Sequence, residues 1–133
     1  MRAMLYLLLL VCGLLSGCET APVKQMTTDI KSVFETPKGD PELAAGIRSY
    51  EEGNYDVAQQ QLQSALKSGL NSFGEIKAHK YLAFINCAAG RESRCREEFR
   101  KVLWLDPDFT LAPAEAGHPI WGPVFRSVKA EQR

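Results

Sequence analysis

Cysteine and histidine are the side chains that most often carry covalent, redox or metal chemistry, and they are sparse in this chain of 133 residues. They comprise Cys12, Cys18, Cys87, Cys95, His79 and His118. The two histidines lack the short spacing typical of metal ligands, and no glycine-rich phosphate loop or nucleophile elbow occurs. The acids of Glu51-Glu52 and Glu97-Glu98 are adjacent, so on a helix they face different ways. We therefore expect no metal, no cofactor and no enzymatic activity, and we turn to the cysteines.

Cys18 closes an apolar segment near the N-terminus. Arg2 supplies a positive charge, and the apolar run 5–15 is shorter than the roughly 20 residues of a spanning helix but suits the core of a signal peptide. Residues 15–18, Leu-Ser-Gly-Cys, resemble the lipobox of bacterial lipoproteins, in which small side chains admit the peptidase and the thiol accepts a diacylglycerol. The resemblance implies a signal peptide over residues 1–17 and a membrane anchor on Cys18. An ordinary cleaved signal with a chance cysteine is the alternative.

The residue after the lipid-bearing cysteine bears on localisation. In the lipoproteins that this segment resembles, aspartate there favours the inner membrane, so Glu19 implies the outer membrane, facing the periplasm. That compartment is oxidising, and Cys87 and Cys95 are the pair left after Cys12 and Cys18, so a disulfide is expected. Two buried free thiols are the alternative.

Charge and length limit what the mature chain can do. Cleavage leaves 116 residues, enough for one small domain. Arg2 is the one charged residue removed, so 15 basic residues face 16 acidic ones. No basic field is present to hold nucleic acid, and no second apolar stretch is long enough to cross a membrane.

Residues 18–40 are interpreted as a lipidated N-terminus and tether. They hold Pro22, Pro37 and Gly39 among polar residues, and a flexible chain of this length would span roughly 25 Å. From Pro41 onward, apolar residues recur with a helical period, and we find no sustained alternation typical of strands. Helices are expected over 41–50, 57–66, 76–87 and 95–105, so the sequence predicts an all-α domain over residues 41–128 with a tail at 129–133.

The four predicted helices form two similar pairs. Aligning Gly53 with Gly90 gives a period of 37 residues, with the excess over about 34 placed in a loop from Gly69 to Gly74. Both pairs resemble tetratricopeptide repeats. The first rests on Gly46, Tyr50, Gly53, Tyr55, Ala58, Ala65 and Leu66, and the second on Ala83, Gly90, Phe99, Leu103, Asp106 and Pro107. Glu92 departs from the pattern, where an aromatic residue is usual. A generic pair of helical hairpins is the alternative.

The pairing places Cys87 late in one helix and Cys95 early in its antiparallel partner. Such a placement can bring the α-carbons within the range of a disulfide, which would act as a structural staple. Beside it, the basic residues of 91–101 are interleaved with acids. This favours an exposed helix with four-residue ion pairs, such as Glu97 to Lys101, over an anion-binding surface.

The C-terminal segment is interrupted by prolines and glycines over residues 109–123, so it cannot be one straight helix. Pro123 suits the first turn of a final helix, on which Trp121, Val124, Phe125 and Val128 form an apolar stripe. A repeat array needs a cap, so we expect this helix to cover the second pair. Use of Trp121 and Phe125 as a docking surface is the sharper alternative, and the two roles are compatible.

A narrower resemblance covers most of the mature chain. The lipobox, the short array with Lys-Tyr-Leu-Ala-Phe at 80–84 and the ending Gly-His-Pro-Ile-Trp-Gly-Pro-Val-Phe at 117–125 resemble the TssQ-type lipoproteins. That resemblance implies an accessory role in type VI secretion, through binding to a protein subunit of a cell-envelope complex. A pilotin-like or other envelope-assembly lipoprotein is the runner-up, and a cell-wall hydrolase would need convergent acids that we do not find. The candidate partner-binding residues are Arg48, Tyr50, Lys77, His79, Tyr81, Asn86 and Trp121.

Overall fold

The computed structural model describes residues 36–132, and all the regular structure in that range is helical. The predicted signal peptide, the lipid site Cys18 and most of the predicted tether lie outside the described residues. The helices are α3 (Asp40–Glu51), α4 (Tyr55–Ser68), α5 (Ser72–Ala88), α6 (Glu92–Leu105), α7 (Pro113–Ala116) and α8 (Trp121–Ala130). The prediction of an all-α fold is confirmed. Within residues 36–132, none of the helices combines the length and apolar character needed to cross a membrane.

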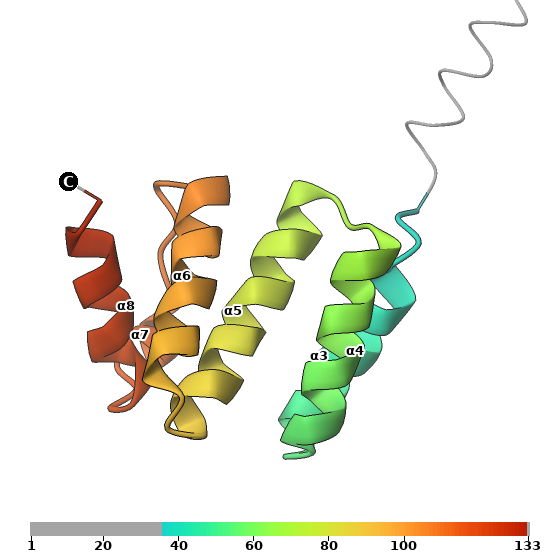
Figure 1. Cartoon of the computed structure of the whole chain (residues 1–133), viewed down its shortest axis with the longest axis horizontal. Helices are drawn as coiled ribbons and strands as arrows, with labels where there is room; N and C mark the ends of the chain where they lie inside the picture. The colour runs from blue at the N-terminus through green and yellow to red at the C-terminus, as the bar shows by residue number, and fades with distance from the viewer. Residues whose placement is uncertain (1–35, 133) are drawn as a thin grey trace, which may run out of the picture. The chain divides into compact units, whose positions relative to one another are not determined.

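The helices form two hairpins followed by a C-terminal cap (Figure 1). Helix α3 packs on α4 and α5 on α6, α5 joins the two hairpins through contacts with α3 and α4, and α8 packs on α6 and α5. The predicted pairing and the predicted capping helix are therefore present. Membership of the tetratricopeptide class stays a prediction.

Both hairpins turn through the same backbone arrangement. Gly53 and Gly90 have positive φ angles of 80° and 71°, a conformation that glycine adopts without a steric penalty. After α3, the Asn54 amide donates to the Ser49 carbonyl at 2.8 Å, and after α5 the Arg91 amide donates to the Asn86 carbonyl at 2.8 Å. These bonds close a helix end through a left-handed residue. The alignment of Gly53 with Gly90 therefore matches two structurally equivalent turns.

Helices α5 and α6 begin about one turn earlier than the apolar pattern predicted. Helix α5 starts at Ser72 because the Asn71 side chain accepts a hydrogen bond from the Gly74 amide at 2.8 Å and caps the first turn. The predicted loop from Gly69 to Gly74 is therefore wrong in its second half. Helix α6 starts at Glu92 rather than Cys95. The apolar pattern did not reveal this start because residues 92–94 are polar and exposed.

Small side chains allow close packing inside each hairpin. Ala58, Ala83 and Cys95 have no exposed surface. A disulfide joins Cys87 to Cys95, with their α-carbons 5.1 Å apart, and the sequence prediction of this bond is confirmed. The bond ties the end of α5 to the start of α6.

Polar bonds tie the cap to the loop that precedes it. The Lys129 ammonium donates to the Phe109 carbonyl at 2.6 Å, and the Arg126 guanidinium donates to the Ala116 carbonyl at 3.1 Å. Phe125 and Val128 are buried against the second hairpin. Helix α8 thus covers the apolar end of α5 and α6, and Pro123 lies in its first turn as expected.

Candidate interaction surfaces

A row of aromatic rings crosses the helices from α3 to α8. The Tyr50 and Tyr81 ring centroids are 5.0 Å apart, those of Tyr81 and Phe84 are 5.9 Å apart, and those of Phe84 and Trp121 are 4.5 Å apart. Tyr55 adjoins Tyr50 at 5.4 Å. The structure therefore brings together three of the predicted partner-binding residues, Tyr50, Tyr81 and Trp121.

The two central tyrosines are partly buried, and their acidity is altered. The pKa of Tyr50 is raised to about 12, chiefly by burial, with smaller contributions in the same direction from Tyr55, Tyr81 and the Glu115 carboxylate. Burial also raises the pKa of Tyr81, with smaller contributions from the Glu115 and Glu51 carboxylates. Both phenols are therefore neutral near pH 7, where they can donate or accept a hydrogen bond.

Trp121 is enclosed more fully than a docking residue would be. Phe84 stacks on one side of its ring, and His118 stacks with it at a centroid distance of 3.3 Å and an interplanar angle of 2°. Its indole N–H donates to the Glu115 carbonyl at 3.0 Å. Stacking contacts and the one hydrogen-bond donor of Trp121 are thus used within the protein.

Two of the candidate residues lie between helices. Asn86 is 6% exposed, donates to the Leu82 carbonyl at 2.8 Å and accepts from Arg91 at 2.8 Å. Its side chain secures the turn after α5 and offers little surface to a partner, and its predicted role in partner binding stays a prediction. His79 is mostly covered and contacts the Glu98 carboxylate of α6 at 2.6 Å, so it too belongs to the packing of the second hairpin.

Glu98 is the centre of a small polar network. Lys101 lies 3.0 Å from the same carboxylate that His79 contacts. Burial opposes ionisation of Glu98, but hydrogen bonds from His79 and Lys101, together with their charge, outweigh it and hold its pKa below the usual value. The network links His79 on α5 to Glu98 and Lys101 on α6.

Helix α5 carries an accessible line of side chains, which we call the α5 stripe: Phe73, Lys77 and Tyr81. Residues four apart lie on one helix face. Phe73 is 66% exposed, and the Lys77 ammonium lies 4.4 Å from its ring centroid. Tyr81 joins the stripe to Tyr50 on α3, the helix that also exposes Arg48. The sequence prediction included Lys77 and Tyr81 but missed Phe73, because residues 69–74 were assigned to a loop.

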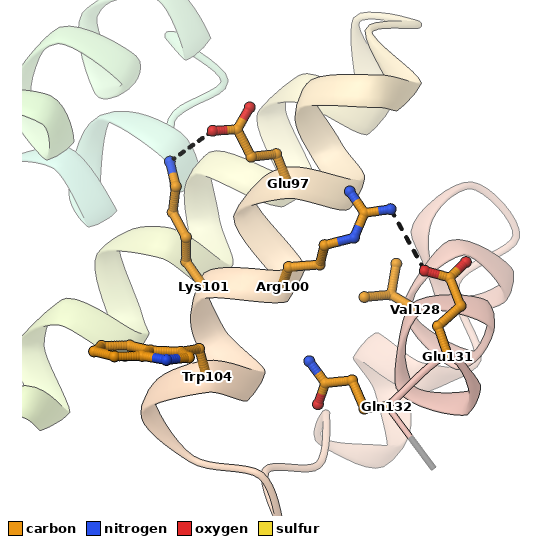
Figure 2. A pocket seen from close by; sticks show the side chains of 7 residues that line it. All are labelled: Glu97, Arg100, Lys101, Trp104, Val128, Glu131 and Gln132. Carbon is orange, nitrogen blue, oxygen red and sulfur yellow. Dashed lines mark hydrogen bonds and ion pairs between the residues drawn. The ribbon is translucent and has the colours of Figure 1, made fainter.

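A second surface lies on the outer side of α6 (Figure 2). Trp104 is 81% exposed, more than any other large apolar side chain in residues 36–132. It borders a groove of about 510 Å³ between α6 and α8. The groove is lined by Glu97, Arg100, Lys101, Trp104, Val128, Glu131 and Gln132. Arg100 points toward Glu131 at 3.4 Å and Lys101 toward Glu97 at 3.3 Å, so its charges are matched within the protein.

No family model, curated protein or solved structure matches this chain. Membership of the TssQ-type lipoproteins stays a prediction.

The described residues offer binding chemistry at both surfaces. Within residues 36–132, no three histidine, cysteine, aspartate or glutamate side chains are grouped so that they could hold a metal ion. Phe73 of the α5 stripe lies beside the Lys77 ammonium, and Trp104 lines the α6 groove together with Arg100 and Lys101. The sequence analysis missed Trp104, which is out of phase with the buried residues of α6. A helical projection of residues 92–105 would have placed it on the exposed face.

Proposed function

We propose that this protein is a lipid-anchored module for protein–protein interaction, held by Cys18 on the periplasmic side of the outer membrane and acting as an accessory of type VI secretion. The observation that carries the proposal is the α5 stripe, in which an exposed Phe73 and the cation of Lys77 adjoin Tyr81. Aromatic side chains that keep a large accessible area are typical of the residues that dominate binding energy.

The surroundings of the stripe favour binding to a partner. Tyr81 is held by Tyr50 and Phe84 through ring contacts, and the Lys80 ammonium, paired with Glu115 at 2.6 Å, lies 4.9 Å from the Tyr81 ring centroid. Side chains that are already ordered lose less conformational entropy when a partner arrives. We expect the stripe to take a short protein segment that places apolar groups on Phe73 and Tyr81.

The anchor is supported by the sequence at positions 15–18. Lipid on Cys18 would keep the helical unit near the membrane, and the residues between Cys18 and Gly39 would set its reach. Incorporation of a labelled fatty acid tests this part directly. The full-length chain should take up the label, and Cys18→Ser should not. Equal labelling of the two would contradict the proposed anchor.

A pull-down tests the partner. The intact protein is purified from gently solubilised membranes, and co-purifying proteins are identified by mass spectrometry. We expect type VI membrane-complex subunits with the wild-type chain. Recovery of a secretin would instead support the pilotin-like alternative, and recovery of no secretion component would contradict the assignment.

Matched variants locate the binding surface in the same experiment. Phe73→Ala and Lys77→Glu should lose the partner, because they remove an exposed ring and reverse a charge on the α5 stripe. Gln63→Ala, an exposed polar residue on α4, should retain it. Since Phe73 is 66% exposed, its truncation should leave the melting temperature almost unchanged. Equal recovery with all three variants would rule out the stripe.

A further inference from the structure

Helix α6 presents a line of four side chains that the proposed function does not use. Arg94, Glu97, Lys101 and Trp104 are spaced by three, four and three residues, so they lie along one helix face. The buried residues of α6 are Cys95, Phe99, Val102 and Leu103, on the opposite side. Trp104 is 81% exposed, and the side chains of Glu97 and Lys101 are 63% and 42% exposed. We call this line the α6 stripe.

The side chains of the α6 stripe are complementary to those of a second α6 stripe that runs in the opposite direction. In an antiparallel pair of α6 helices centred on Phe99, Glu97 lies opposite Lys101 of the second copy, and Arg94 lies opposite Trp104 of the second copy. A two-fold axis repeats each contact, because residue i meets j and j meets i. Glu97 and Lys101, which pair with each other at 3.3 Å within one copy, would exchange to form two ion pairs between the copies, flanked by two cations that each face an indole ring.

We propose that the α6 stripe is a self-association surface that binds the α6 stripe of a second copy in antiparallel orientation. This goes beyond the proposed function, since it uses another helix and another partner. The charges beside the stripe do not oppose it: Arg96 and Arg100 both pair with Glu131. The groove next to Trp104 leaves room for large side chains of the second copy.

Self-complementarity is what selects a second copy over an unrelated partner. The stripe carries two cations, one anion and one aromatic ring, and an unrelated protein would need its own matching order. A second copy of α6 supplies that order when the two helices are antiparallel and centred on Phe99. A membrane anchor on Cys18 would also raise the effective concentration of the two copies, so a modest interface would suffice.

Charge reversal tests the pairing. The intact protein is measured in detergent, with micelles in large excess, by analytical ultracentrifugation over a range of concentrations. The wild-type chain should form a concentration-dependent dimer. Glu97→Lys and Lys101→Glu each place like charges in contact twice, and each should weaken dimerisation by at least about tenfold. Because Lys101 also pairs with Glu98 in the same chain, the Lys101 variants are first shown by circular dichroism to keep the wild-type helical spectrum. The double variant Glu97→Lys/Lys101→Glu restores opposite charges and should recover most of the lost affinity.

Two further variants complete the design. Trp104→Ala should weaken dimerisation by about tenfold while keeping the helical circular dichroism spectrum, since the ring is exposed. Glu52→Lys makes the same charge change at an exposed site on the first hairpin and should dimerise normally.

Several results would overturn the inference. These are a wild-type chain that stays monomeric at every concentration, a dimer indifferent to Glu97→Lys or Trp104→Ala, and a double variant no better than the single ones. Capture of an unrelated protein through Trp104 by a monomeric chain would likewise exclude the second copy as the occupant. The pull-down on the α5 stripe is read separately, so failure of one proposal leaves the other testable.

Discussion

The indole ring of Trp121 on α8 lies against the phenyl ring of Phe84 on α5, with the centroids 4.5 Å apart and the planes 22° apart. His118 stacks on the same indole. Stacked rings at this separation bury a large apolar area and attract each other through their quadrupoles. The contact joins the cap to the second hairpin, so Trp121 acts chiefly in stability.

Truncation of this ring should therefore destabilise the fold. We expect Trp121→Ala to lower the free energy of unfolding by about 3 kcal/mol, the lower end of the range for buried aromatic residues, because Trp121 keeps some exposure. Urea unfolding followed by circular dichroism measures the change. Trp104→Ala removes the same ring from an exposed position and should change stability by less than about 0.5 kcal/mol. Equal losses from the two variants would contradict the assigned role of Trp121.

The Cys87–Cys95 disulfide should contribute to stability through the unfolded state. It closes a loop with a sequence separation of 8, for which loop-closure entropy predicts a contribution of about 2.5 kcal/mol. We expect a reductant to shift the urea midpoint of the wild-type chain to lower concentration. The double variant Cys87→Ala/Cys95→Ala should have a low midpoint that the reductant does not change. A wild-type midpoint insensitive to full reduction would show that the bond adds little.

Sequence patterns predicted the hairpins because helical periodicity and glycine turns are local signals. The turns after the first helix of each pair require a left-handed residue, and Gly53 and Gly90 supply it. The start of α5 was missed because an asparagine cap depends on one side-chain bond, that of Asn71, and leaves no apolar pattern. Local signals therefore predict where helices occur better than they predict the residue at which each helix starts.

The candidate surface was harder to predict than the fold. A sequence identifies Tyr81 or Asn86 as capable of binding, but exposure depends on which neighbours cover each side chain. Asn86 is buried and hydrogen-bonded to Arg91 and the Leu82 carbonyl, whereas Phe73 is 66% exposed in the first turn of α5, which the Asn71 cap begins. These outcomes rest on single side-chain hydrogen bonds between residues three to five apart, which an apolar pattern does not reveal.

Acid should weaken the second hairpin through Glu98. Its pKa is lower in the folded protein than the ordinary value of 4.5, so the folded state binds fewer protons than the unfolded state as the pH falls through that range. The stabilisation is present above pH 4.5 and is lost as the pH falls toward the folded pKa. Stability of the wild-type chain, measured by urea unfolding between pH 7 and pH 3, should thus fall more steeply than that of Glu98→Gln.

A matched control separates this effect from general acid sensitivity. Glu92→Gln removes a carboxylate that is 71% exposed from the same helix, and its stability should follow the wild-type pH dependence. Parallel curves for Glu98→Gln and the wild-type chain would mean that the network with His79 and Lys101 does not couple protonation to folding.

Alkali should act on Tyr50 in the opposite sense. Burial raises its pKa to about 12, so above pH 10 the unfolded chain releases a proton that the folded chain retains. Unfolding is then favoured, and stability falls as the pH rises from 10 toward 12. Tyr50→Phe keeps the ring contact with Tyr81 but has no proton to lose, so its unfolding free energy should decline less steeply over that range. Tyr81, whose pKa is also raised, leaves some dependence in the variant. An unchanged slope in Tyr50→Phe would show that the Tyr50 hydroxyl is as well solvated in the folded protein as in the unfolded chain.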